Sequence, residues 1–301
     1  MKIFRILALA DIHGNIKALK TLISFLTKQK IEIDLIIIAG DLPLTTPIRL
    51  MLRFIINHAS ISKKKYTKWV YKGNGRKIFV NKQIKSVSTI LSLFETISAP
   101  IVYVSGNVDS FEAQNMLKNW SNSKIHFLNS NEIIFGSLRI RGIGGSLHSS
   151  ERSDSPLCDM EFNDNDFSNR IDPILESEVI EDSFIDILVT HEPPAFIYSN
   201  HKNKIRGGSS AITKLITRIK PNLVIFGHYH EYPLLKREPK KVTYLNPGPL
   251  ACYYYSLIEI NNRNLDISLK RMNPKKIDPI NIIYSNRINP NNVKKHFKLV
   301  E

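Results

Sequence analysis

Five short apolar runs constrain the fold of this chain more than any other feature. They occupy residues 3–10, 34–40, 101–106, 186–191 and 223–228. The centre of each run is an unbroken series of apolar residues, which is typical of a strand buried on both faces of a sheet. The stretches between the runs are long enough for helices. Buried strands that alternate with helices predict an α/β fold made of layered sheets.

Local signals place helices and turns around these strands. Asn15 is expected to cap a helix, and the apolar face of that helix comprises Ile16, Leu19, Leu22, Ile23 and Leu26. Ser209 or Ser210 is expected to begin another helix that continues to Ile219. Residues 133–145 predict a hairpin about Gly136 and Ser137. Residues 241–260 and 264–270 predict further antiparallel strands.

Every one of the five strands is followed by side chains that can bind a metal. They are Asp11 and His13, Asp41, Asn107, His191, and finally His228 and His230. A glycine precedes the group in three cases, which allows a tight turn or a close approach of the backbone. Because α/β proteins build their sites at the carboxyl ends of strands, we expect these side chains to converge.

The ligand types narrow the choice of metal. Imidazole and carboxylate groups together favour Mn, Fe, Zn, Ni or Co over Ca or Mg. Seven such groups are enough for two divalent metal ions. Two ions that share a carboxylate lie roughly 3.5–4 Å apart and can hold the oxygens of a phosphoryl group. The sequence therefore predicts a cofactor of two divalent metal ions, with their identity left open.

The order of these motifs resembles the calcineurin-like metallophosphoesterase superfamily. The motifs are D-x-H, G-D, G-N, H and G-H-x-H, and the flanking THEPP (190–194) and LNPGP (245–249) resemble its small bacterial and archaeal phosphodiesterase branch. The resemblance implies an α/β fold of the four-layer αββα sandwich type, which we assign to residues 1–270. It also implies that Asp11, His13 and His230 hold the first metal. Asn107, His191 and His228 would hold the second, and Asp41 would bridge the two.

The resemblance further implies a metal-dependent phosphoesterase, most simply a phosphodiesterase acting on a phosphate-ester substrate. A metal-bridging hydroxide would attack phosphorus, with Asp41, Asn107 and His191 as catalytic residues. One position departs from the widespread family pattern, because Val108 follows Asn107 where the family has a histidine. Valine cannot protonate a leaving group, so we expect a preference for activated or nucleotide-type leaving groups. His148 is a candidate substitute acid, although a plain loop histidine is the simpler interpretation.

Charge is distributed unevenly along the chain, whose formal net charge is +15. A basic insert at about 45–85 interleaves lysines with aromatic residues, which suits single-stranded nucleic acid and suggests a nuclease acting on DNA or RNA. The simpler alternative is a hairpin about Gly73-Asn74-Gly75 with solvated lysines. An acidic loop at about 151–182 can contact this insert within one chain or between the subunits of a homo-oligomer, or it can form a mobile rim near the site; the sequence leaves both alternatives open. A basic C-terminal extension occupies 271–301.

A third interpretation is a non-catalytic protein-interaction scaffold on the same fold. That class predicts broken ligand positions, whereas all seven positions here carry the expected residue types. The chain has two cysteines, and its N-terminal apolar run ends at Asp11 without a cleavage signal. No run approaches the length of a membrane span. These features predict a cytoplasmic protein.

Overall fold

The computed structural model describes residues 3–44, 74–120, 124–147, 159–176, 185–198, 208–230, 232–237, 242–261 and 264–272. Several sequence predictions concern residues outside these ranges. They are the lysine-rich part of the insert at 45–73, His148, and nearly all of the extension at 271–301.

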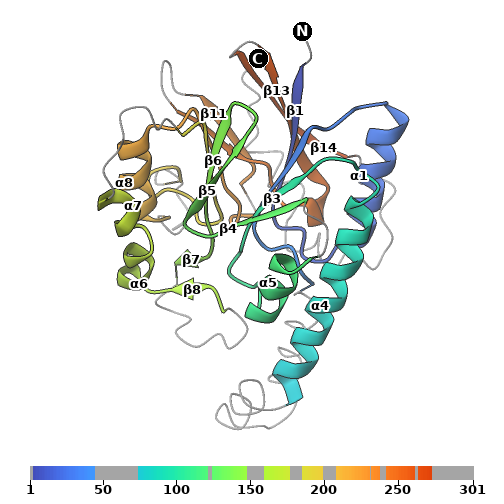
Figure 1. Ribbon diagram of the computed structural model, residues 1–301, viewed down its shortest axis with the longest axis horizontal. Helices are drawn as coiled ribbons and strands as arrows, with labels where there is room; N and C mark the ends of the chain where they lie inside the picture. The colour runs from blue at the N-terminus through green and yellow to red at the C-terminus, as the bar shows by residue number, and fades with distance from the viewer. Residues whose placement is uncertain are drawn as a thin grey trace.

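Two six-stranded sheets form the centre of the molecule (Figure 1). The first sheet has the order β14-β13-β1-β2-β3-β4. Its strands are β1 (Phe4–Leu9), β2 (Leu35–Ala39), β3 (Ile101–Val104), β4 (Ile125–Leu128), β13 (Tyr254–Asn261) and β14 (Asn264–Arg271). Strands β1 to β4 are parallel, and β13 and β14 continue the sheet in antiparallel fashion on the other side of β1.

The second sheet repeats this design with the order β11-β12-β10-β9-β6-β5. Its strands are β5 (Asn131–Phe135), β6 (Leu138–Ile143), β9 (Ile187–Thr190), β10 (Leu223–Ile225), β11 (Leu234–Arg237) and β12 (Thr243–Asn246). The four inner strands are parallel, and β5 and β11 are antiparallel to their neighbours. Two short strands, β7 (Ser146–Leu147) and β8 (Glu161–Phe162), form a separate parallel pair.

Helices cover the outer face of each sheet (Figure 1). The first sheet is covered by α1 (Ile16–Lys28), α4 (Asn74–Phe94) and α5 (Phe111–Lys118), and the second by α6 (Asp164–Asn169), α7 (Asp172–Glu176) and α8 (Ser210–Ile219). A short 3-10 helix occupies Leu250–Cys252. The four layers confirm the predicted αββα sandwich. No helix in the described ranges is long and apolar enough to cross a membrane.

The apolar runs explain this layering, because both faces of each inner strand are buried. In β1, Leu7 and Leu9 pack against the helices, whereas Ile6 and Ala8 pack between the two sheets. Alternate residues of a strand point to opposite faces, so one continuous apolar run supplies two cores. A third core lies between the second sheet and its helices.

The predicted caps and the hairpin are confirmed. Asn15 caps α1 by accepting a hydrogen bond from the Ala18 N–H at 3.0 Å, and Ser209 caps α8 by accepting one from Ile212. The hairpin of β5 and β6 turns at Gly136, whose φ is +61°.

Two local predictions are wrong. The hairpin about Gly73-Asn74-Gly75 is contradicted because Asn74 begins the long helix α4. The strands after residue 241 are not all antiparallel, since β12 pairs in parallel with β10. The acidic stretch, described over residues 159–176, contains β8, α6 and α7.

Candidate metal centre

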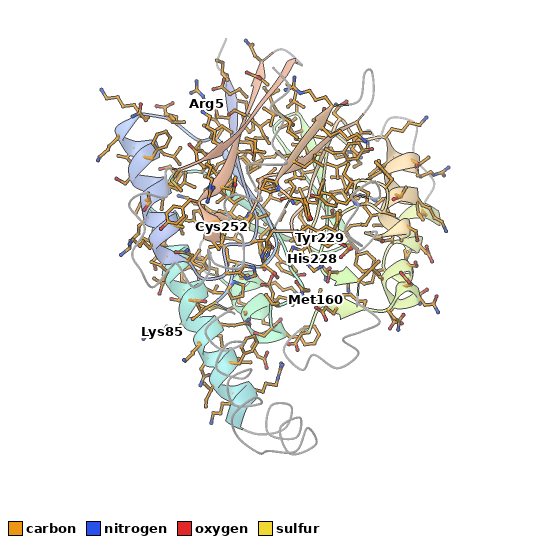
Figure 2. The ribbon with its side chains drawn as sticks, turned by 180° about the vertical axis from the view of Figure 1, so that it is seen from behind. Arg5, Lys85, Met160, His228, Tyr229 and Cys252 are labelled. Atoms are coloured by element: carbon orange, nitrogen blue, oxygen red, sulfur yellow. The ribbon has the colours of Figure 1, made fainter. Side chains whose placement is uncertain are left out.

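The carboxyl ends of three strands of the first sheet meet those of two strands of the second sheet at one edge of the sandwich. β1 delivers Asp11 and His13, β2 delivers Asp41, and β3 delivers Asn107. The loops after β9 and β10 deliver the three remaining histidines, which are His191, His228 and His230. Figure 2 shows His228 near the middle of the molecule, between the two helical layers. The structure thus brings together all seven side chains singled out in the sequence.

Asp11, His13 and His230 form one half of the cluster. The Nε2 atom of His230 lies 3.1 Å from Oδ1 of Asp11 and 3.0 Å from Nε2 of His13. The Nε2 atom of His13 lies 3.9 Å from the same Asp11 oxygen. The backbone N–H of His228 donates to both Asp11 oxygens, at 3.3 and 3.1 Å, and so fixes the carboxylate.

Asn107, His191 and His228 form the other half. The Nε2 atom of His191 lies 3.1 Å from Oδ1 of Asn107, and the rings of His191 and His228 have their centres 5.0 Å apart. The Nδ1 atom of His191 lies 2.9 Å from the Ala39 carbonyl oxygen. A carbonyl can only accept a hydrogen bond, so Nδ1 is the donor, and in the neutral imidazole the Nε2 lone pair faces the cluster.

Asp41 lies between the two halves. Its Oδ2 atom is 3.7 Å from Nε2 of His13 and 3.6 Å from Nε2 of His191. Its Oδ1 atom accepts a hydrogen bond of 3.1 Å from the backbone N–H of Val108. The carboxylate is almost fully buried. Asp41 is therefore held where one carboxylate can serve both groups.

Glycines allow the strand ends to approach one another this closely. A Cβ atom on Gly106 would lie 2.0 Å from Oδ1 of Asp41, and one on Gly40 would lie 2.3 Å from Nδ1 of His191. A Cβ on Gly227 would lie 2.8 Å from Oδ2 of Asp11. Carbon atoms do not come so near to nitrogen or oxygen without a bond. The glycine before three of the ligand positions is thus a packing requirement, beyond its role in a turn.

Four of the seven residues have backbone torsions that residues with side chains rarely adopt. The φ angles are +50° at Asp11, +48° at His13, +53° at Asp41 and +71° at His228. Such left-handed backbone costs of order 1–3 kcal/mol per residue and persists only where the surroundings enforce it. Hydrogen bonds between loops do so here, for example from the His13 N–H to the Asp41 carbonyl at 2.8 Å. These four are half of the eight non-glycine residues with positive φ in the described ranges.

Three residues that support the cluster were missed in the sequence. Glu161 accepts a 2.7 Å hydrogen bond from Nδ2 of Asn107. Glu192 has Oε2 3.7 Å from Nε2 of His228 and also accepts a hydrogen bond from the Leu147 N–H. Asn246, within LNPGP, has its Nδ2 atom 3.1 Å from the carbonyl oxygens of Tyr229 and Tyr232. Only the THEPP and LNPGP matches pointed toward Glu192 and Asn246, and no motif pointed to Glu161.

Electrostatics at the cluster favour the ionised form of one carboxylate, Asp11, and disfavour that of two others, Asp41 and Asp109. Burial raises the pKa of Asp11, but His230, His191 and His13 outweigh it and hold that pKa well below its ordinary value. Burial and the neighbouring Asp11 charge raise the pKa of Asp41, although His191 and the Val108 N–H partly oppose them. Burial and the charge of Asp41 raise the pKa of Asp109 well above its ordinary value. Added positive charge would favour all three ionised forms.

The third ligand strand ends differently from the widespread family pattern. Val108 is 1% exposed, and two hydrogen bonds hold its backbone. Its N–H donates to Asp41, and its carbonyl accepts from Nε2 of Gln83 at 2.7 Å. Asp109 does not join the cluster as a ligand. Its Oδ2 atom instead accepts hydrogen bonds from the Gly106 N–H, at 2.6 Å, and from the Tyr103 hydroxyl. Asp109 therefore closes the turn that carries Asn107.

The cluster fits divalent cations. One donor atom from each of Asp11, His13, Asp41 and His230 can be chosen so that all four lie within 4.8 Å of one another. The Nε2 atoms of His13 and His230 face each other at 3.0 Å, a separation that needs a proton or a cation between them. Imidazole nitrogens, carboxylates and an amide oxygen are the ligands that first-row metals prefer. The residues present therefore match the predicted metal chemistry.

Comparison with known proteins supports the same conclusion. The family model described as calcineurin-like phosphoesterase matches residues 4–232. A protein of Thermus thermophilus has a similar structure, with a TM-score of 0.59, 16% identity, and coverage of 89% of this chain and 99% of the other. A candidate 5′-nucleotidase of Staphylococcus aureus gives a TM-score of 0.51 and 10% identity over 96% of this chain and 58% of the other. At these identities the solved structures establish the fold alone. No curated protein sequence matched.

Proposed function

Because this chain belongs to the calcineurin-like phosphoesterase family, we propose that it is a phosphodiesterase that uses two divalent cations held by the seven clustered side chains. Asp11, His13 and His230 would hold one cation, and Asn107, His191 and His228 the other. The position of Asp41 carries this proposal. Its Oδ2 atom is nearly equidistant from the Nε2 atoms of His13 and His191, as a shared ligand requires.

The side chains are prepared for this task before any ion binds. Bound cations would activate a water molecule for attack on phosphorus and neutralise the charge that develops on the phosphoryl oxygens. The Ala39 carbonyl fixes the tautomer of His191, and the Val108 N–H fixes the orientation of Asp41. Such partners raise metal affinity because the ligands need not reorganise.

The buried Val108 supports a preference for diesters with good leaving groups. A general acid typically contributes 10²–10⁴-fold to a rate, and valine offers no proton. The loss is greatest when the leaving oxygen is a poor leaving group. We expect the purified chain with Mn²⁺ to turn over bis-p-nitrophenyl phosphate faster than p-nitrophenyl phosphate. Faster turnover of the monoester would contradict the preference.

The Asp41→Asn variant distinguishes an enzyme from a non-catalytic protein-interaction scaffold. The substitution keeps the size of the side chain but removes the charge between the two ligand groups. Hydrolysis should disappear while the circular dichroism spectrum of the metal-free protein stays the same. Asp164→Asn is the matched control. It removes the charge of an exposed carboxylate on α6 and should retain activity. Unchanged hydrolysis in Asp41→Asn would contradict the proposed role of this residue.

A nuclease is the second candidate, favoured by the distribution of charge over the two helical layers. Neither α1 nor α4 contains a carboxylate, and both lie on the first sheet (Figure 1). Their exposed lysines are Lys17, Lys20, Lys28, Lys77, Lys82 and Lys85. The helices α6 and α7 on the opposite layer carry aspartates and no lysine. The third helix of that layer, α8, carries Lys214 and Arg218, so exposed lysines are more numerous in the first layer but are not confined to it.

Oligonucleotide binding by the metal-free protein tests this second candidate. Each lysine that contacts a phosphate of a single strand steepens the fall of log affinity with log salt concentration by about 0.7. The double variant Lys82→Glu and Lys85→Glu should bind a single-stranded oligonucleotide more weakly and with a shallower slope. Lys214→Glu with Arg218→Glu on α8 is the control. Equal weakening in both double variants would indicate non-specific electrostatic attraction of the oligonucleotide and would contradict a binding surface on α4.

A further inference from the structure

The amide of Asn107 has two ends of nearly equal shape but opposite chemistry. Its Oδ1 atom lies 3.1 Å from Nε2 of His191, on the side of the cluster. Its Nδ2 atom donates a 2.7 Å hydrogen bond to Oε1 of Glu161. Only the oxygen can bind a cation, because the NH₂ group presents hydrogens. A fixed acceptor at the nitrogen end therefore decides whether Asn107 can act as a ligand at all.

Glu161 reaches Asn107 because β8 is held against the turn after β3. The Met160 N–H donates to the Asn107 carbonyl at 3.4 Å, and the Ser146 N–H donates to the Met160 carbonyl at 2.9 Å. Gly145 allows this approach, since its φ is +88° and a Cβ there would lie 2.8 Å from the Met160 oxygen. Figure 2 shows Met160 in the middle of the molecule, close to His228 in that view.

An ion pair anchors the start of β8 to the helices of the first layer. The guanidinium of Arg76, in the first turn of α4, donates to both oxygens of Asp159 at 2.9 Å. It also donates to Glu112 of α5, at 2.9 Å to the nearer oxygen. The Phe111 N–H donates to Asp159 as well, at 3.0 Å. A two-pronged arginine–carboxylate pair fixes direction as well as distance. Asp159 is two residues from Glu161, so this anchor limits where Glu161 can lie.

We propose that Glu161 is a positioning residue that turns Oδ1 of Asn107 toward the metal centre, and that the Arg76–Asp159 ion pair holds Glu161 in place. This inference rests on the proposed function, because it assumes that Asn107 is a ligand. It assigns a role to the acidic stretch that separates β6 from β9 in the sequence. It also connects the centre to α4, the helix that follows the lysine-rich insert.

Binding of Mn²⁺ alone to the full chain tests the role of Glu161. Free Mn²⁺ is measured by electron paramagnetic resonance during titration, so the readout does not depend on activity. Wild type is expected to bind two ions, and Asn107→Ala to weaken one of them. Glu161→Ala should weaken the same ion about 10–100-fold. Glu161→Gln should keep most of the affinity, because the glutamine oxygen still accepts from Nδ2. Asp164→Ala removes an exposed carboxylate from the same stretch and should match wild type.

The possible outcomes distinguish the inference from its premise. If Asn107→Ala weakens one ion and Glu161→Ala does not, the positioning role is overturned while the metal assignment stands. If Glu161→Gln is as impaired as Glu161→Ala, the negative charge matters and the acceptor role is overturned. If Asn107→Ala binds both ions like wild type, the proposed ligand set fails, and the inference fails with it. Melting of each metal-free variant at the wild-type temperature shows that the fold is intact.

A second pair of variants tests the anchor. Arg76→Gln removes both bonds to Asp159 and should weaken the same Mn²⁺ ion several-fold. Glu112→Gln removes the charge of the other partner and leaves the Arg76–Asp159 pair, so Mn²⁺ binding should match wild type. Wild-type binding by Arg76→Gln would overturn the anchoring role of the ion pair. Equal losses in both variants would show that the whole three-residue cluster, and not the Asp159 pair, is required.

Discussion

Only glycine fits at position 106, because Asp41 occupies the space that a side chain there would need. We predict that Gly106→Ala abolishes or strongly reduces metal binding, since the new methyl group would lie 2.0 Å from Oδ1 of Asp41. The carboxylate must then move out of the position between the two ligand groups. Metal content by mass spectrometry, with the rate of diester hydrolysis, measures the effect.

Gly136→Ala is the control for this glycine prediction. Gly136 has φ +61° at a hairpin tip, and among the described residues no atom lies within 4 Å of the position that a methyl group would take there. That variant should lose a little stability from backbone strain, about 1 kcal/mol, and keep its full metal content. Wild-type metal content in Gly106→Ala would show that Asp41 tolerates displacement.

Tyr103 supports the site from the core side of β3. Its hydroxyl donates to the buried carboxyl group of Asp109, which also accepts from the Gly106 N–H. Tyr103→Phe removes one of these donors while keeping the packed ring. Because Asp109 keeps the Gly106 donor, we predict a loss of about 0.5–1.5 kcal/mol in the free energy of unfolding, the usual net contribution of one hydrogen bond. Urea unfolding of the metal-free protein measures it.

Tyr255→Phe controls for the loss of a hydroxyl from a buried ring. Among the described residues the Tyr255 hydroxyl forms no hydrogen bond, and its ring is also buried in the first-layer core. That change should alter the free energy of unfolding by less than about 0.5 kcal/mol. Equal changes in the free energy of unfolding of the two variants would contradict a specific contribution of the Tyr103 hydroxyl.

At the residue scale, the sequence predicted the residues of the centre but not their supports. Asp11, His13 and the other proposed ligands follow apolar strands, and this pattern can be read directly from the sequence. Glu161 contacts Asn107 from 54 residues away, and its neighbours in the sequence resemble any acidic surface stretch. Glu192 lay inside a recognised motif, yet its proximity to His228 depends on how two loops meet. Contacts of this kind are set by tertiary packing, which no local pattern encodes.

At the scale of elements, the last residue of β12 holds the loop that carries His228 and His230. Nδ2 of Asn246 lies within 3.1 Å of the carbonyl oxygens of Tyr229 and Tyr232 and of the Tyr198 hydroxyl. We predict that Asn246→Ala costs about 1–3 kcal/mol in the free energy of unfolding, because the Tyr229 carbonyl loses this donor, whereas the Tyr232 carbonyl keeps the Tyr198 hydroxyl. It should also weaken Mn²⁺ binding, since both histidines become less fixed.

Asn222→Ala is the matched control for the Asn246 prediction. Asn222 is exposed at the start of β10, and its backbone carbonyl, which accepts from the Thr243 N–H, survives the substitution. Unfolding and Mn²⁺ titration of this variant should reproduce wild type. If Asn246→Ala behaves in the same way, the LNPGP loop has no supporting role.

The same scale shows where sequence patterns were misleading. Gly73-Asn74-Gly75 has the composition of a turn, but Asn74 begins α4 because the following turns bury Phe79, Val87, Ile90 and Phe94. Burial of such side chains outweighs the local cost of a glycine in a first turn. The parallel pairing of β12 with β10 was likewise hidden, since an isolated strand of four residues carries no sign of its partner's direction.

At the scale of the whole molecule, the centre draws side chains from both sheets, which also pack against each other through a shared apolar core. Metal binding should therefore stabilise the complete fold. A ligand present at 100 times its dissociation constant adds about 2.7 kcal/mol to the stability of the folded state. We predict that Mn²⁺ at this excess raises the melting temperature by several degrees, measured by differential scanning fluorimetry.

Asp41→Asn supplies the control for metal-linked stability. This variant should melt at a temperature that is nearly independent of Mn²⁺, because the shared ligand is lost. A chelator should reverse the effect of Mn²⁺ on wild type. If the melting temperature of wild type changes with neither Mn²⁺ nor the chelator, the predicted coupling between metal binding and the stability of the fold is contradicted.

The strand order of the first sheet has a consequence for how the protein is made. β1 ends at Leu9, but the antiparallel strand that completes its second edge begins only at Tyr254. While the ribosome translates the residues in between, that edge presents unpaired N–H and C=O groups to other nascent chains. Protection by chaperones is therefore expected to matter throughout this period, because the sheet cannot close until Tyr254 and the residues after it have left the ribosome.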